Sequence, residues 1–267
     1  GTISGLFGSC FLVGSIIAWA ASGYITGNLG WRMSFHIPAL LTILLIPLFY
    51  LGVKDEPKNA HEQKEKIKES KPKLRFWRIL QSRKFIIIAA AYTLLQFVRS
   101  GFTLWAPSYI FETYGLSLET ASYGSTLIPL GGIAGSIIAG WLSDKFRFYK
   151  RVPIMASMSL CLTLLLITLY NASSYGFYTG IIILFLSGLT LYGPHVIMVT
   201  TIPMDYGDEY GAAGIAGFID GIGYIGTTFA DPFVGWIADT MGWGGAVTFW
   251  VISALSSSIL IMSLLKH

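Results

Sequence analysis

The chain has 267 residues, of which 54% are hydrophobic and only 12% are charged. A soluble domain carries about 25% charged residues, so about half of the usual surface charge is missing. This composition excludes a nucleic-acid-binding domain, a disordered chain and a disulfide-stapled secreted module, and both cysteines, Cys10 and Cys161, lie in apolar runs. The sequence therefore predicts an all-α membrane protein that crosses the lipid bilayer several times.

Eight stretches are long and apolar enough to cross about 30 Å of hydrocarbon as helices. These predicted spans cover residues 1–26, 33–53, 85–111, 119–142, 152–170, 176–201, 211–239 and 244–265. Their continuous apolar runs favour helices over a closed β-barrel, whose strands alternate between apolar and polar residues. The first span begins without an initiator Met or a charged leader, so we do not interpret it as a signal peptide, and we expect the chain to be part of a longer protein.

The basic residues predict the orientation of these spans. Of the 18 Lys and Arg residues, 11 lie in the segment 54–84, which follows the second span. Four more follow the fourth span: Lys145, Arg147, Lys150 and Arg151. By the positive-inside rule, we expect the segment 54–84 and the C-terminus to be cytoplasmic. The net charge of +4 is then a consequence of topology and does not indicate a nucleic-acid partner.

The first two spans resemble the last two. An offset of 212 residues brings seven identical residues into register, among them Gly30-Trp31 with Gly242-Trp243. We interpret residues 85–267 as a complete six-helix bundle and residues 1–53 as the last two helices of another bundle. The polar segment 54–84 would be the linker between the two bundles. Four spans are then expected upstream of residue 1.

Glycines recur at a four-residue spacing in several of the spans. In the fourth span this pattern is formed by Gly131 and Gly135. Small residues at this spacing allow two helix backbones to approach closely within lipid. The fourth span is therefore expected to pack tightly against a neighbouring helix.

Two motifs resemble a known transporter family. The run Gly140-Trp-Leu-Ser-Asp144-Lys145, followed by Arg147 and Arg151, resembles the cytoplasmic loop signature of the major facilitator superfamily. The run from Arg99 to Tyr109, RSGFTLWAPSY, resembles the seventh helix of the organophosphate:phosphate antiporters, the glycerol-phosphate and hexose-phosphate transporters. Leu191–Pro194 and Gly217–Gly226 resemble their tenth and eleventh helices. The resemblance implies the major facilitator fold, with eight transmembrane helices present out of twelve, helices five to twelve.

This resemblance implies a secondary active transporter that moves a small anionic solute by alternating access. The solute would be a phosphate ester or an organic anion, exchanged for phosphate or coupled to protons. The loop residues Gly140, Asp144, Lys145, Arg147 and Arg151 would gate the transporter by joining its two halves. We expect a monomer in the plasma (inner) membrane, with the lipid bilayer and a small anionic substrate as its partners.

Two alternative functions remain open at this stage. One is a transporter-like membrane sensor of sugar phosphate, and the other is a proton-coupled transporter of a non-phosphorylated solute. An enzyme is not expected, because the sequence lacks a His, Asp and Glu cluster with metal-ligand spacing, and no cofactor is implied.

Arg99 is the strongest candidate for substrate binding. It lies 14 residues into its span, where an unpaired guanidinium is costly unless it meets a carboxylate, a polar cavity or an anionic substrate. Guanidinium matches phosphate with two parallel hydrogen bonds. Tyr92 and Gln96 share its helix face and are further candidates. A snorkelling arginine or an ion pair with Asp220 are the structural alternatives.

Asp220 is the second charge inside a predicted span, and we expect it to couple protons to transport or to neutralise Arg99. The antiporters carry a histidine where the alignment puts Cys10, so a thiol there puts inorganic or glycerol-type phosphate specificity in doubt. His195 is expected to supply a titratable donor instead, or to serve as a polar packing residue. Tyr224, from the motif that resembles the eleventh helix, completes the candidate substrate-binding set.

Overall fold

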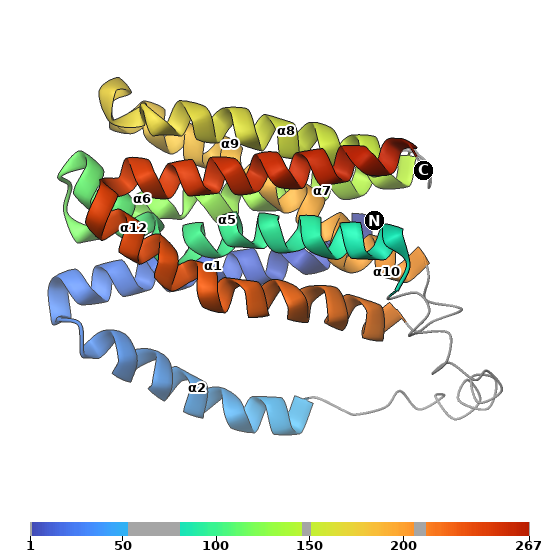
Figure 1. Cartoon of the computed structure of the whole chain (residues 1–267). Helices are drawn as coiled ribbons and strands as arrows, with labels where there is room; N and C mark the ends of the chain where they lie inside the picture. The colour runs from blue at the N-terminus through green and yellow to red at the C-terminus, as the bar shows by residue number, and fades with distance from the viewer. Residues whose placement is uncertain (1, 53–80, 146–150, 206–211, 267) are drawn as a thin grey trace.

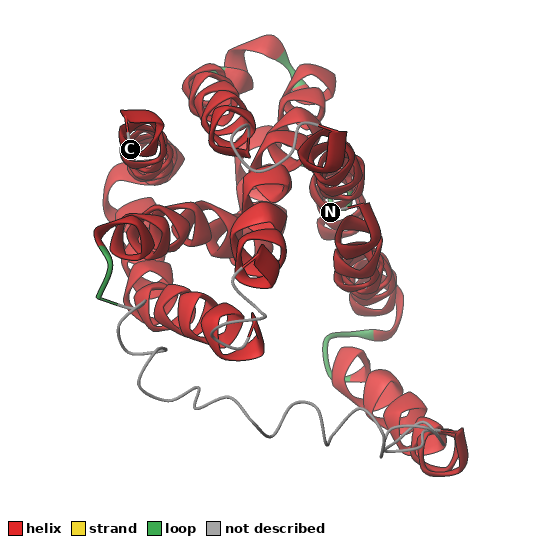
Figure 2. Ribbon diagram, turned by 90° about the vertical axis from the view of Figure 1, so that its right-hand side faces the viewer, coloured by secondary structure: helices red, strands yellow, loops and turns green. Residues whose placement is uncertain are grey.

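The computed structural model describes residues 2–52, 81–145, 151–205 and 212–266, and these ranges contain helices and short connections but no strand (Figures 1 and 2). In hydrocarbon a backbone has no water to bond, so the helix, which satisfies its own N–H and C=O groups, is the expected solution for long apolar runs. The all-α class predicted from the sequence is confirmed. Most of the linker predicted at 54–84 lies outside the described residues.

The long helices follow the predicted spans closely. Their bounds are α1 Thr2–Leu29, α2 Met33–Gly52, α5 Arg83–Tyr114, α6 Leu118–Ser125, α7 Leu127–Lys145, α8 Arg151–Tyr170, α9 Phe177–Val196, α10 Ile202–Asp205 and α12 Ala212–Ser263. Helix α6 continues into α7 after Thr126, so the two form one apolar run. A π-helical turn, η3 at Ile197–Thr201, joins α9 to α10, and 3₁₀ turns lie at Ala172–Tyr175 and Leu264–Lys266.

The predicted spans 211–239 and 244–265 are the two arms of one long element, α12, which a kink at Gly242 divides. Within the described ranges, seven helices are long and apolar enough to cross a membrane, where the sequence predicted eight. Helix α12 runs for 52 residues and bends at Gly242, the residue inside it with a non-helical conformation. At 1.5 Å per residue it would be about 78 Å long if straight, far more than one bilayer crossing needs. Figure 1 shows its two arms folding back on each other.

The bends after α1 and within α12 use the same residue type at matching positions. Gly30 has φ 84° and Gly242 has φ 74°, both in the left-handed region that residues with a Cβ adopt at a cost. Each glycine is followed by tryptophan, Trp31 and Trp243. The sequence repeat at an offset of 212 residues therefore has a structural counterpart in two bends whose glycines both have a positive φ.

Two helix pairs form the centre of the bundle: α5 with α12, and α7 with α9. The glycine pattern predicted a close approach for α7, and the structure confirms it. A Cβ at Gly131 would collide with the Phe185 carbonyl of α9, and a Cβ at Gly135 would collide with that of Leu189. Around these pairs the largest fully buried side chains include Trp250, Tyr92 and Phe102.

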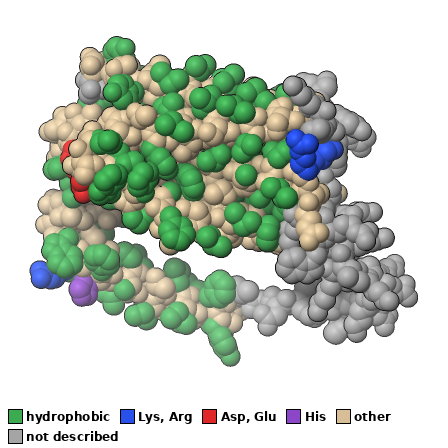
Figure 3. Space-filling view, in the orientation of Figure 1, with side chains coloured by type: hydrophobic (Ala, Val, Ile, Leu, Met, Phe, Trp, Pro, Cys, Tyr) green, Lys and Arg blue, Asp and Glu red, His purple; other side chains and the backbone are tan. Residues whose placement is uncertain are grey.

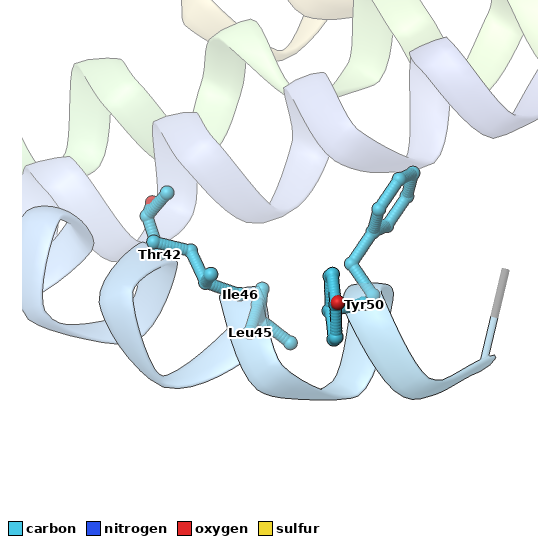
Figure 4. A pocket seen from close by; sticks show the side chains of 5 residues that line it. Thr42, Leu45, Ile46 and Tyr50 are labelled. Carbon is cyan, nitrogen blue, oxygen red and sulfur yellow. The ribbon is translucent and has the colours of Figure 1, made fainter.

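Helix α2 lies apart from the bundle (Figures 1 and 2). None of its residues is buried, and a shallow groove on it is lined by Thr42, Leu45, Ile46, Phe49 and Tyr50, all of α2 itself (Figure 4). On the face seen in Figure 3, hydrophobic side chains spread along the middle of the bundle and charged ones lie toward its ends. This distribution suits a protein surrounded by lipid.

Candidate functional site

A cavity of about 170 Å³ lies among α1, α5, α9, η3 and α12. It brings together charged and titratable side chains from helices that are far apart in the sequence. The lining residues are Gly8, Phe11, Leu12, Arg99, Tyr192, His195, Val196, Val199, Thr200, Asp220 and Tyr224. Four of the predicted site residues, Arg99, His195, Asp220 and Tyr224, therefore share one cavity.

Arg99 is held in this cavity by neutral groups. The residue is only 6% exposed. Its Nε donates to Gln96 Oε1 over 2.7 Å, and its Nη2 donates to the Tyr224 hydroxyl over 3.0 Å. The guanidinium carbon also lies 5.6 Å from the centre of the Tyr224 ring and 5.7 Å from that of Phe11. These contacts orient the guanidinium without cancelling its charge.

No carboxylate among the described residues lies within 4.0 Å of the Arg99 guanidinium. The ion pair with Asp220, one of the alternatives predicted from the sequence, is therefore not formed in this structure. A buried guanidinium inside an apolar bundle is costly when it lacks a counter-ion. The arrangement thus leaves a positive charge beside a cavity that an anion can enter.

Asp220 instead pairs with Tyr92. The Tyr92 hydroxyl donates to Asp220 Oδ1 over 2.5 Å and lies 3.1 Å from His195 Nε2. Tyr92 itself is fully buried, with 0% exposure, and its ring lies 5.2 Å from that of His195. Three titratable side chains from α5, α9 and α12 therefore form one hydrogen-bonded chain at the edge of the cavity.

The local structure explains how these side chains are aligned. Ser82 caps the start of α5 by accepting a hydrogen bond from the Phe85 N–H, and Gly115 ends the helix with φ 63°. Between these caps, Tyr92, Gln96 and Arg99 recur at spacings of four and three residues and so share one face.

On α12, Asp220 and Tyr224 are likewise one turn apart and face α5. Gly223 lies between them, and a Cβ there would come within 2.5 Å of Tyr92 Cε1. The absence of a side chain at Gly223 is therefore what admits the Tyr92 ring.

The third wall of the cavity comes from the end of α9. His195 follows Pro194, and the chain then continues into the π-helical turn η3, which contributes Val199 and Thr200 to the cavity. Single π-helical turns within helices occur frequently at functional sites. The widened turn shifts the residues after His195 relative to a regular α-helix and so shapes this wall.

The structure places the remaining predicted residues elsewhere. Cys10 is exposed on α1 and is not among the cavity-lining residues, whereas its neighbour Phe11 is. Gly140 is buried in α7, while Asp144 and Lys145 are exposed at its end. Arg147 lies outside the described residues.

Arg151 begins α8 and forms an ion pair with Asp205 of α10. Its Nη1 also donates to the Thr201 carbonyl over 3.2 Å. This contact ties the start of α8 to the end of the span formed by α9, η3 and α10.

The cavity-lining residues that sequence reasoning missed include Phe11, Tyr192 and those of the η3 turn. A signal for Tyr192 was present, because it lies three residues before His195 and so shares its helix face. In the described part of the chain, no cluster of three or more His, Cys, Asp or Glu residues could hold a metal ion.

Comparison with known proteins gives the family of this chain. The family model described as "Major Facilitator Superfamily" matches residues 1–230. The chain belongs to the major facilitator superfamily. This assignment confirms the major facilitator fold predicted from the sequence motifs.

Several curated relatives of this superfamily member carry names that specify a phosphorylated substrate. It is 29% identical over 259 residues to the "Glycerol-3-phosphate transporter" of Bacillus subtilis (strain 168), with 91% of this chain and 58% of the relative covered. It is 26% identical to the "Probable hexose phosphate transport protein" of Chlamydia pneumoniae, covering 87% of this chain and 56% of the relative. It is also 26% identical to "Glucose-6-phosphate exchanger SLC37A2" of Mus musculus, with 95% of this chain and 58% of the relative covered.

These relatives confirm the resemblance to the organophosphate:phosphate antiporters. The chain spans 56–58% of the length of each of the three relatives.

Proposed function

We propose that this superfamily member moves a phosphate ester, or a related small organic anion, across the membrane by alternating access. The cavity that holds Arg99 would be its binding site. The three relatives are named for glycerol phosphate or hexose phosphate, and the site chemistry of this chain fits such a ligand.

One observation carries this proposal: Arg99 is buried, lines a cavity, and has no carboxylate counter-ion among the described residues. An anionic ligand would give the guanidinium the direct contact with a negative charge that it lacks in this structure. Guanidinium forms bidentate hydrogen bonds with phosphate and stays charged at any physiological pH. The Tyr224 hydroxyl and the neutral Gln96 amide already orient the guanidinium, so binding costs little additional side-chain entropy.

We further propose that residues 1–53 and 85–267 belong to two bundles joined by the linker 54–84, which would lie in the cytoplasm together with the C-terminus. The basic residues predict this orientation by the positive-inside rule, in the plasma (inner) membrane. The protein would act as a monomer.

A gate at the cytoplasmic ends of the helices is part of the same proposal. It would include Gly140, Asp144, Lys145, Arg147 and Arg151. The Arg151–Asp205 ion pair supports a latch at this end, because it joins α8 to the last turn of the α9–η3–α10 span.

The experiment that tests the function is counterflow in proteoliposomes. The full-length protein is reconstituted in vesicles loaded with unlabelled glycerol 3-phosphate, glucose 6-phosphate, inorganic phosphate or glycerol, and the uptake of labelled glycerol 3-phosphate is measured. We expect the phosphorylated compounds to drive uptake and glycerol to fail. Equal uptake with glycerol inside, or no uptake under any loading, would overturn the proposal.

A further inference from the structure

We propose that Asp220, Tyr92 and His195 form a proton-binding site, and that the proton held there is moved together with the anion bound at Arg99. This inference rests on the proposed anion site and adds the second transported ion. It is carried by geometry: the three side chains form one continuous hydrogen-bonded chain, and both of its ends, Asp220 and His195, line the cavity.

Tyr92 has a single hydroxyl hydrogen, and this fixes the direction of its hydrogen bonds with Asp220 and His195. That hydrogen points to Asp220 Oδ1, 2.5 Å away. The contact of 3.1 Å between the Tyr92 oxygen and His195 Nε2 then requires the histidine to be the donor, with its proton on Nε2. Asp220 accepts the Tyr92 hydrogen in this arrangement, and when its carboxylate is ionised these hydrogen bonds can pass a proton toward it.

Proton uptake is a relay of three transfers. A proton binds Nδ1 of His195, the Nε2 proton moves to the Tyr92 oxygen, and the Tyr92 hydroxyl proton moves to Asp220 Oδ1. The products are a neutral Asp220, an intact Tyr92 hydroxyl and a neutral His195 that carries its proton on Nδ1. One proton has been bound, and only N–H and O–H bonds have been exchanged.

The charged and titratable groups that face Asp220 link binding of this proton to binding of the anion. Helix α5 contributes Arg99 and Tyr92, α9 contributes Tyr192 and His195, and α12 itself contributes Tyr224. The cavity residues from α1 and η3 do not titrate.

An empty cavity with Arg99 charged and Asp220 ionised is neutral overall. A cavity that holds one monoanion is neutral only when Asp220 is protonated. Since charge is costly at this depth in the membrane, binding of the anion and binding of the proton favour each other.

The first test does not depend on transport. Infrared difference spectra of the purified full-length protein are recorded between alkaline and acidic pH, and the C=O stretching band of a protonated carboxyl group is followed. The control residue is Asp231 of the same helix as Asp220, whose carboxylate accepts a hydrogen bond from the Ser100 hydroxyl and which is not among the cavity-lining residues. We expect a component that Asp220→Asn removes, that Tyr92→Phe shifts in frequency, and that Asp231→Asn retains. An acid-induced band unchanged in Asp220→Asn would overturn the proposal.

The second test measures coupling. Uptake of labelled glycerol 3-phosphate into proteoliposomes is measured under two conditions. The vesicles either contain phosphate, or contain none and take up the compound under an inward proton gradient. The quantity compared between variants is the gradient-driven rate divided by the rate with internal phosphate. We expect the gradient to drive uptake in the wild type, Asp220→Asn to lower the ratio about tenfold or more, and Asp231→Asn to leave it unchanged. Wild-type uptake that ignores the gradient, or a ratio unchanged in Asp220→Asn, would overturn the proton site.

The two proposals fail in different ways. If the wild type shows no counterflow with any phosphorylated compound, the proposed function fails, and the infrared band alone then decides on the proton site. If counterflow is normal but neither the gradient nor the band responds to Asp220, the anion site stands and the proton site is refuted.

Discussion

The guanidinium of Arg99 donates a hydrogen bond of 3.0 Å to the Tyr224 hydroxyl, and the Tyr224 ring lies 5.6 Å from the same guanidinium carbon. One side chain of α12 therefore contacts the charge of α5 through both its polar and its aromatic part. Tyr224 is 50% exposed, so this contact lies at the open side of the cavity rather than in the core. The contact gives Tyr224 a place where it can meet an entering anion together with Arg99.

Arg99→Lys is expected to abolish transport while leaving the protein folded and inserted. An ammonium keeps the charge but lacks the planar pair of donors that matches phosphate, and it cannot reproduce both bonds to Gln96 and Tyr224. We expect counterflow of glycerol 3-phosphate to fall about a hundredfold, the result of losing about 2.7 kcal/mol. The matched control is Arg83→Lys at the exposed start of the same helix, which should behave like the wild type. Wild-type kinetics in Arg99→Lys would refute the assignment.

Tyr224→Phe separates the two contacts that Tyr224 makes with Arg99. The ring stays in place, but the hydroxyl that accepts from Nη2 is lost. A hydrogen bond to a charged group contributes about 1.5–3 kcal/mol, so we expect the KM for counterflow to change by about tenfold or more while the protein level in the membrane is unchanged. If KM and kcat both match the wild type, the hydroxyl plays no part in binding.

Gly223→Ala should disturb the contact between α5 and α12 at the cavity. The added Cβ would come within 2.5 Å of the Tyr92 ring, which is fully buried and cannot move aside freely. Overpacking of this kind costs about 1–3 kcal/mol. We expect a lower melting temperature in detergent and reduced counterflow. Gly221→Ala on the same helix has no atom within 4 Å of the new methyl group among the described residues and is the matched control. Equal behaviour of the two variants would contradict the packing seen here.

The ion pair between Arg151 and Asp205 can be tested by exchanging its partners. Both side chains are largely buried, with 14% and 17% exposure. We expect Arg151→Asp and Asp205→Arg each to lower the thermal stability of the purified protein, and the double variant to recover part of the loss. The coupling energy should be about 1 kcal/mol or more. Additive losses without recovery would show that the pair contributes nothing as a pair.

The sequence was sufficient for the features that depend on one helix. Tyr92, Gln96 and Arg99 were placed on one face from their spacing alone, and the structure brings Gln96 Oε1 to 2.7 Å from Arg99 Nε. Gly131 and Gly135 likewise predicted a close approach of α7 to a neighbouring helix, which the structure shows to be α9. Such predictions succeed because the period of the α-helix fixes which residues are neighbours.

Contacts between helices were harder to predict. Nothing in the sequence shows that Asp220 bonds to Tyr92 rather than to Arg99, since this depends on how far α12 slides along α5. The placement of Cys10 shows the limit of an ungapped alignment. Adjacent residues on a helix differ by about 100° in direction, so Phe11 lines the cavity while Cys10 is exposed. The predicted spans 211–239 and 244–265 correspond to the two arms of α12 on either side of Gly242, whose non-helical conformation separates them.

Tyr92 has no exposed surface and stands between His195 and Asp220. A hydrated sodium ion cannot pass through a buried phenol, whereas a proton can cross it by exchanging one O–H bond for another. The ion selectivity of such a pathway then follows from the way the charge travels rather than from any difference in binding affinity. A transporter built on this chain would discriminate protons from metal cations without needing a coordination shell for either.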